Sequence, residues 1–428
     1  MNKYSLSALM AAGLVAGSLS AGSASAADLG GNCCADLEER IAELEATTAR
    51  KGNRKVSLTV SGWVGQQVTF WDDGGESNVY VHDLGTTLGS HVKFTGQATI
   101  LPGWTAGYVL HLEAIGSDGL TTSQDTPDGP SVLTGGTNGV GTLQSFWFIK
   151  SDQLGKVSVG KQSQASDNTA ILVDGSGSLV PANWVSFDVN SFFVRRSDTG
   201  ALTDVTFGNA GGCVWGDCNG LPTNSVRYDS PTFGGFSVSA SWGEDDFWDV
   251  AARYAGEWAD FKVSGAVAYS ESSWYNRTPN MVQPFGSQYL QVGLYAEHIP
   301  TGLFAYGAYG HLDLDGTSAD ANETFYVKGG IRQRWNPLGH TVLYGEYERA
   351  ENNFAVAGVD PDGILDPTFV GNSRINMWGL GVVQEIDAAA MSIWVKYRNI
   401  DAHLNDVVEG GIPTDNFQYV GMGALINF

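Results

Sequence analysis

Apolar and polar residues alternate along most of this chain, and that period of two constrains the fold more than any other feature. In 56–70, Val56, Leu58 and Val60 take every second position, and polar residues stand between them. The same alternation returns in many later segments, which is typical of β-strands that bury one face only. Beyond the first residues, no unbroken apolar stretch is long enough to cross a membrane as a helix. We therefore expect an all-β fold.

Short turns and long loops alternate between the predicted strands. Pro102-Gly103 and Asn336-Pro337 are short turns, whereas 71–88 and 117–142 are long and rich in Asp, Gly, Asn and Ser. Short turns on one rim and long loops on the other are typical of outer-membrane barrels. We predict a transmembrane antiparallel β-barrel of about 16 strands over 56–428. The predicted strands are 56–70, 89–101, 104–116, 143–151, 154–161, 223–230, 233–243, 246–255, 258–270, 287–298, 301–313, 323–335, 338–350, 373–386, 388–400 and 415–428.

The strand count depends on how residues 162–222 are interpreted. A further hairpin near 191–207 would raise it to about 18. We prefer one long loop, because 191–207 alternates poorly and is interrupted by Arg195-Arg196-Ser197-Asp198. The last predicted strand ends at the aromatic Phe428. Since the strand count is even and turns alternate with loops, we expect this strand to pair with 56–70 and close the barrel.

The N-terminal residues predict export. An apolar run from Leu6 to Ala16 precedes Ala24-Ser25-Ala26, which fits the cleavage pattern of a signal peptide spanning 1–26. Segment 27–55 follows, and within it 35–50 places its apolar residues on one helical stripe. We expect a short periplasmic helix there, either in a coiled coil or packed on the protein's own periplasmic face. Cys33 and Cys34 precede it and are compatible with cross-chain disulfides and with free thiols.

Charge and motifs exclude several function classes. A net charge of −23 makes nucleic acid an unsuitable partner. The sequence has no His-Glu-x-x-His, no Gly-x-Ser-x-Gly and no phosphate-binding loop. We therefore predict no enzyme activity, no cofactor and no metal site. Two acidic clusters resemble calcium loops only faintly, since they lack the full ligand spacing: Asp313/Asp315/Asp320 and Asp360/Asp362/Asp366.

The long loop 162–222 is the candidate functional segment. It carries Asp167, Asp174 and Asp188 together with apolar patches such as 170–173. A loop exposed to water has no need of these patches, whereas a loop folded into the lumen would use them to pack on the barrel wall. We predict that its acids stand at the narrowest part of a pore, the alternative being a surface loop with a small core of its own.

Basic residues occupy the water-facing register of several strands. A charge facing lipid would cost about 2–4 kcal/mol at the membrane midplane, so we expect these bases to line the lumen. Acids on the loop opposite bases on the wall would set a transverse field that affects selectivity. In the alternative, the bases only balance scattered carboxylates. The predicted wall bases are Lys93, Arg227, Arg253, Lys262, Lys328, Arg332, Arg334, Lys396 and Arg398.

A further pair of cysteines lies inside the long loop. Cys213 and Cys218 bracket Val-Trp-Gly-Asp, and in an oxidising compartment we expect them to form a local disulfide. A metal pair is the weaker alternative, because no His or second Cys pair lies nearby in sequence.

The chain resembles the porins of alphaproteobacteria, particularly the rhizobial type. The resemblance rests on 60–64, 91–96, the run 157–162 leading into 174–181, and the terminal strand that ends at Phe428. It implies a homotrimer in the outer membrane, in contact with lipid and lipopolysaccharide. It also implies a lumen narrowed by the third external loop, with passive diffusion of ions and small hydrophilic solutes. The helix at 35–50 departs from this plan.

Alternative functions remain compatible with the sequence. The 13 Trp residues would suit a substrate-specific channel for sugars or oligosaccharides, whose rings stack on aromatic side chains. A closed barrel with a structural or adhesion role is another alternative. Saturable block of the current by a solute would indicate the first, and stable membrane insertion without conductance the second.

Overall fold

The computed structural model describes residues 55–135, 139–244, 246–272, 286–315, 321–352, 356–359, 365–406 and 410–428. The predicted signal peptide 1–26 lies outside these ranges, as do Cys33, Cys34 and, apart from Lys55, the segment 27–55. Asp320, Asp360 and Asp362 of the two acidic clusters also lie outside them.

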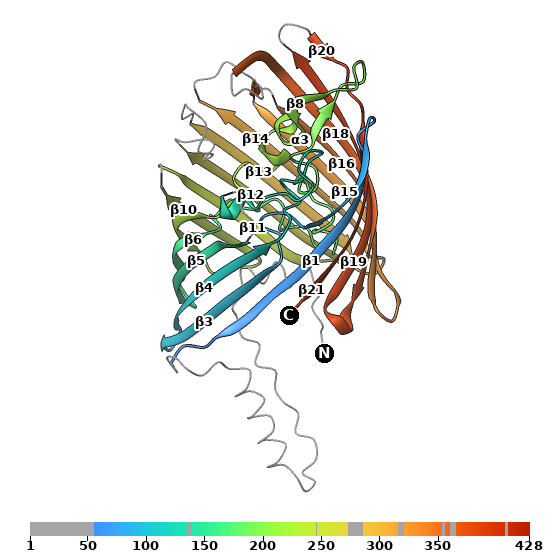
Figure 1. Cartoon of the computed structure of the whole chain (residues 1–428). Coiled ribbons are helices and arrows are strands. Elements are labelled where there is room, and N and C mark those ends of the chain that lie inside the picture. Colours follow the sequence, from blue (N-terminus) through green and yellow to red (C-terminus); the bar gives the residue numbers. More distant parts are fainter. Residues whose placement is uncertain are drawn as a thin grey trace.

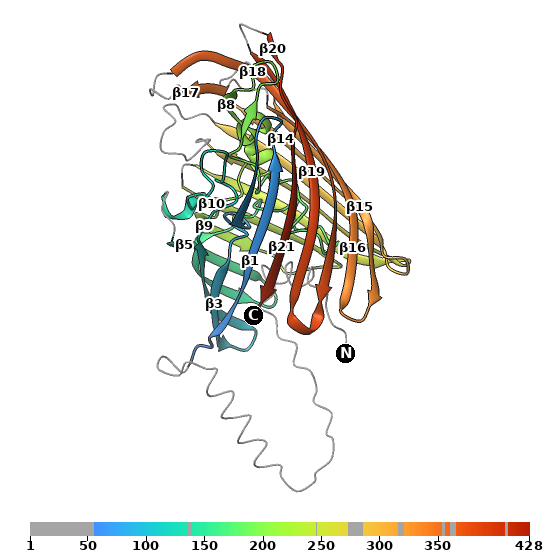
Figure 2. The ribbon, with the colours of Figure 1, turned by 45° about the vertical axis from the view of Figure 1, so that its right-hand side comes forward.

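The described strands form a closed antiparallel barrel of 16 strands, which confirms the predicted fold class and strand count. Figures 1 and 2 show the ring from two sides. Each strand pairs with the next along the chain. In this order the strands are β1 (Thr59–Asp72), β3 (His91–Leu101), β4 (Trp104–Ile115), β5 (Gly139–Ser151), β6 (Gly155–Gln162), β9 (Thr223–Asp229), β10 (Phe236–Gly243), β11 (Trp248–Trp258), β12 (Phe261–Ser272), β13 (Ser287–His298), β14 (Leu303–Leu314), β15 (Asn322–Asn336), β16 (Gly339–Asn352), β18 (Leu365–Ile386), β19 (Met391–Asp406) and β21 (Phe417–Asn427).

The ring closes where β1 pairs with β21, in a register that runs from Trp63↔Asn427 to Asp72↔Gln418. Phe428 extends this seam, because its backbone N–H and carbonyl both bond to Gly62 at 3.1 Å. The predicted pairing of the first and last strands is therefore confirmed.

The wall beside β1 differs from the prediction. The segment 71–88 is not wholly a loop, because it contains β2 (Ser77–Asp83), which pairs with the upper part of β1. β3 pairs with the lower part of β1, up to Trp63↔His91. Residues 84–90 connect the two strands and leave the ladder. Asp and Gly around β2 concealed it, since both residue types are rare in strands.

The remaining elements are short. β7 (Phe193–Arg195) and β8 (Leu202–Thr206) form a hairpin at 191–207, but in a two-stranded sheet separate from the ring. It therefore adds nothing to the barrel count. The others are β17 (Val356–Val359), β20 (Gly410–Ile412), α3 (Phe207–Gly211) and the single 3₁₀ turns η1 (Val132–Thr134), η2 (Cys213–Trp215) and η3 (Asp387–Ala389). No helix in the described ranges is long and apolar enough to cross a bilayer.

The period of two separates an apolar outer face from a polar inner face. In β19, Ile393 and Val395 are exposed on the outside, whereas Lys396 and Arg398 are buried on the inside. Trp258 and Trp335 are exposed beside short turns, the position of an interfacial aromatic girdle.

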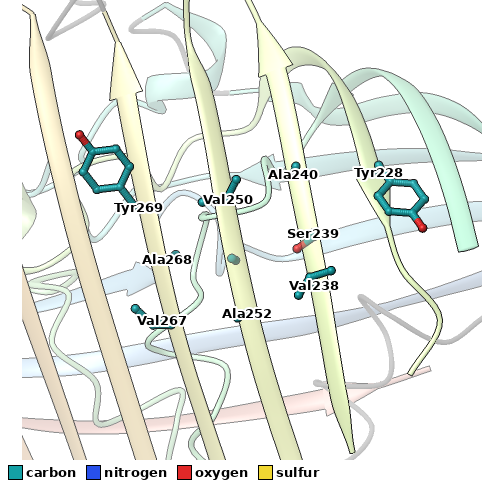
Figure 3. A pocket seen from close by; sticks show the side chains of 10 residues that line it. Tyr228, Val238, Ser239, Ala240, Val250, Ala252, Val267, Ala268 and Tyr269 are labelled. Atoms are coloured by element: carbon teal, nitrogen blue, oxygen red, sulfur yellow. The ribbon is translucent and has the colours of Figure 1, made fainter. Parts of the chain in front are cut away.

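Small side chains shape part of the outer wall. Valines and alanines of β10–β12 leave a hollow of about 400 Å³ between Tyr228 and Tyr269 (Figure 3). Because its lining is almost entirely apolar, it offers little to orient a polar solute. The polar groups that could act on a solute lie inside the ring.

Candidate functional site

Most of the segment between β6 and β9, residues 163–222, lies inside the ring of strands, and its exposed turn at 197–201 reaches the rim near β20 (Figures 1 and 2). We call it the inner loop. It carries α3 and the β7–β8 hairpin. Its apolar side chains, including Ile171, Val173 and Leu179, are buried and belong to the main hydrophobic cluster. The apolar patches thus help to hold the loop inside the barrel.

Polar wall residues bind the first part of the inner loop. The Asp249 carboxylate on β11 accepts hydrogen bonds from the N–H and hydroxyl of Ser166, both at 2.6 Å. On β13, Gln291 accepts from the Ala170 N–H at 3.0 Å. The hydroxyl of Tyr306 on β14 donates to the Ala170 carbonyl at 2.8 Å. The loop backbone is therefore held against three wall strands.

A glycine permits this close approach. A Cβ atom on Gly293 would lie only 2.4 Å from the Ala170 carbonyl oxygen. Any larger residue there would push the inner loop off β13, because contacts this short are strongly repulsive.

Asp174 contacts a wall base directly. Its carboxylate lies 2.6 Å from the Lys328 ammonium on β15, with side-chain exposures of 1% and 0%. The ammonium also donates to the Ala182 carbonyl at 2.7 Å. A buried pair of this kind compensates its desolvation only through close geometry and further hydrogen bonds, and both are present.

Asp188 makes an equivalent contact with β19. Its carboxylate lies 2.5 Å from the Lys396 ammonium and accepts from the Gln67 side chain at 2.9 Å. Burial alone would raise the pKa of Asp188. The positive charges of Lys396 and Arg398, with a contribution from His82, outweigh burial and hold that pKa well below its usual range.

Asp167 lies in a different environment. Its carboxylate accepts from the Asn168 amide at 2.6 Å, and its side chain is buried. Burial, reinforced by the negative charge of Asp217, raises the pKa of Asp167 well above its usual range. Of the three predicted acids, Asp174 and Asp188 therefore meet wall lysines, whereas Asp167 lies beside another acid.

Five of the predicted wall bases donate hydrogen bonds to carbonyls of the inner loop. A cation bonded to a carbonyl fixes the loop backbone in place, which is a different role from facing it across water. The bonds run from Arg227 to Ser163 and Gln164, from Arg253 to Ala165, from Lys328 to Ala182, from Lys396 to Pro181 and from Arg398 to Asn183.

Several of these bases also pair with carboxylates of the wall itself. Arg398 lies 2.8 Å from Glu346, and Arg227 lies 2.7 Å from Asp229. Arg332 pairs in the same way with Glu385 at 2.8 Å. Much of the basic charge is thus balanced within the barrel.

The three remaining predicted bases stand elsewhere on the wall. Arg334 pairs with Asp387 at an exposed position. Lys262 stands opposite Glu257 and Glu297 in the strand register. Lys93 stands opposite His111 on β4, in a separate part of the wall.

A disulfide closes a small ring within the inner loop. Cys213 and Cys218 are bonded, as predicted. Between them, the Trp215 side chain is fully buried, and the Tyr289 hydroxyl on β13 donates to the Gly216 carbonyl at 2.7 Å. The crosslink therefore limits the freedom of a segment that the wall also holds.

Some of the residues that position the loop were not predicted. Asp249, Gln291 and Glu346 all point inward from strands, and each binds the loop or one of its basic partners. Their inward register was visible in the alternation. Their specific contacts were not, because these depend on the path of a loop distant in sequence.

The sequence profile described as Gram-negative porin matches residues 6–411. No curated protein sequence matches the chain. An anion-selective porin from Comamonas acidovorans has a similar structure, with a TM-score of 0.56 and 14% identity, covering 87% of this chain and 100% of that one. OprB of Pseudomonas putida has a TM-score of 0.54 and 11% identity, covering 92% and 97%. OmpT of Vibrio cholerae in its trimer form has a TM-score of 0.52 and 13% identity, covering 87% and 99%. At these identities the likeness concerns the fold.

Proposed function

Because this chain belongs to the Gram-negative porin family, we propose that it is a general-diffusion porin, a water-filled outer-membrane channel for ions and small hydrophilic solutes. One observation carries the proposal: a barrel of 16 strands contains a long loop bound to the inside of its wall. A barrel of this size leaves an aqueous lumen, and a loop held within it would narrow that lumen. Passage then needs no catalytic step.

The test of this proposal is the conductance of the purified protein in a planar lipid bilayer. We expect stepwise insertions, each with a current proportional to voltage. Stable insertion without conductance would contradict the proposal and favour a closed structural barrel. Concentration-dependent, saturable block by a sugar would instead favour a substrate-specific channel.

We further propose a mild preference for cations. The chain carries a net charge of −23, while many wall bases are engaged by carboxylates or carbonyls. Partly neutralised bases attract fewer anions, so the acidic balance of the chain would determine the sign. The reversal potential in a salt gradient measures this preference, and a value indicating anion preference would contradict it.

Our proposal for the assembly is a homotrimer of the alphaproteobacterial type, exported by residues 1–26. Its support is the resemblance in sequence, together with the trimer form recorded for OmpT of Vibrio cholerae. Sedimentation velocity in a density-matched detergent would give the protein mass of the complex. A monomeric mass under mild extraction would contradict the trimer.

A further inference from the structure

The segment that connects β2 to β3, residues 84–90, covers a group of polar side chains on the inner wall. Residues 84–90 leave the ladder there, and the Thr87 N–H reaches the Glu113 carboxylate on β4 at 3.1 Å. Beneath this segment lie His91, His111 and Glu113, which are 8%, 7% and 1% exposed. The site lies on the β3–β4 wall, between β1 and β5.

These side chains converge on one point. One potential ligand atom from each lies within 4.8 Å of the other two. The strand register explains the convergence, because His91 stands opposite Glu113 and His111 lies two residues before Glu113 on the same face. The imidazole rings of His91 and His111 have centroids 4.1 Å apart.

The hydrogen bonds leave lone pairs for a ligand. His91 Nδ1–H donates to the Gly89 carbonyl at 3.0 Å, which leaves Nε2 as the nitrogen able to bind a metal. His111 Nε2 and Glu113 Oε1 are buried, and within the described residues they have no hydrogen-bond partner. Unpartnered buried polar atoms are rare because each loses its hydration without compensation.

Two imidazoles and one carboxylate form a donor set that suits zinc and similar first-row divalent ions. Around a zinc ion with bonds of about 2.1 Å, tetrahedral ligand atoms would lie about 3.4 Å apart, so small side-chain rotations would complete the site. The hydrogen bond from His91 to the Gly89 carbonyl and the hydrogen bond from the Thr87 N–H to Glu113 are outer contacts of the kind that commonly orient metal ligands. Lys93, on the same face, would oppose a cation and moderate its affinity.

We propose that His91, His111 and Glu113 bind a divalent transition metal, with zinc as the representative ion. The bound ion joins β3 to β4 beneath the 84–90 segment and fastens that segment to the wall. This inference does not depend on the channel proposal, because binding can be measured without any current.

The experiment uses the full folded protein in detergent micelles, freed of metal with EDTA and titrated with ZnCl₂ by calorimetry. We expect one zinc ion per chain. His111→Ala and Glu113→Gln should each weaken binding at least about 10-fold, since loss of even an outer contact has effects of this order. His311→Ala is the matched control, because His311 also lies beside two carboxylates, at 3.2 and 3.4 Å, but its side chain is 34% exposed.

A second measurement uses only the unsubstituted protein, so that a misfolded variant cannot be mistaken for the loss of a metal ligand. Co²⁺ added to the unsubstituted protein should give the visible absorption of a low-symmetry site with nitrogen ligands, and zinc should displace it. Absence of stoichiometric zinc binding would overturn the proposal. Unchanged binding in Glu113→Gln, or loss of binding in His311→Ala, would also overturn it.

Discussion

The Lys328 ammonium lies 2.6 Å from the Asp174 carboxylate, and both side chains are almost completely shielded from solvent. Asp174→Asn would leave the buried ammonium without its counter-charge. We expect it to lower the free energy of unfolding by about 3 kcal/mol and to loosen the inner loop. Differential scanning calorimetry would measure the first effect, and single-channel current noise the second.

The exposed pair Arg349–Glu351 provides the control for this prediction. Glu351→Gln should change stability by less than about 1 kcal/mol, because exposed ion pairs contribute little. Equal effects of the two substitutions would show that Asp174 does not hold the loop.

Asp188 should remain charged under mildly acidic conditions. The depressed pKa of its carboxyl group contributes stability above the ordinary value of 3.8, and this contribution is lost only as the pH falls further. We expect Asp188→Asn to shift the reversal potential toward anions at pH 7 and by the same amount at about pH 5, because it leaves the charge of Lys396 unbalanced. Reversal potentials at both pH values measure the shift. An unchanged reversal potential at both pH values would show that the charge of Asp188 does not affect the selectivity of the channel.

Asp167 should give the opposite pH dependence. Its raised pKa means that the folded protein holds a proton which the unfolded chain releases above about 3.8. Its contribution to stability is therefore full at low pH and is lost as the pH rises through the folded-state pKa, at no more than about 1.4 kcal/mol per pH unit. Asp167→Asn should remove this slope. Thermal unfolding across the acidic to neutral range compares the two proteins, and parallel curves would contradict the prediction.

Substitution of Gly293 would test whether the close approach of the inner loop to β13 requires a glycine. Gly293→Ala places a methyl group against the Ala170 carbonyl, and we expect a loss of about 1–3 kcal/mol in unfolding free energy. Gly265→Ala is the matched control on β12, where the nearest atom would lie 3.4 Å away. Chemical denaturation of both variants measures the difference. If both lose the same stability, crowding by the loop is not the cause.

The barrel was predictable because alternation is local. Within a few residues, the alternation of apolar and polar side chains shows which face of a strand is buried. The pairing of 56–70 with the strand that ends at Phe428 then followed from the number and order of the strands. β2 was missed because its Asp- and Gly-rich surroundings resemble a loop. The interruption at 84–90 also depends on tertiary contacts to Glu113, which no local pattern shows.

The pairing of acids with bases was not predictable. Asp174 and Lys328 are 154 positions apart, and their contact depends on where the inner loop crosses β15. The sequence showed that such acids and bases exist and which faces they occupy. It could not distinguish a charge that faces another across water from one that binds it, because the two arrangements use the same residues.

The seam between β1 and β21 has a consequence for the order of assembly. Because it joins the first and last described strands of the ring, no partly made barrel can form it. Until β1 has paired with β21, β1 and the last strand added to the sheet each present an unpaired row of backbone donors and acceptors that could pair with another chain. Pairing so distant in sequence is slow to form, since a very long stretch of chain must first be brought round. Until the ring closes, these two edges therefore remain open to mispairing with neighbouring chains.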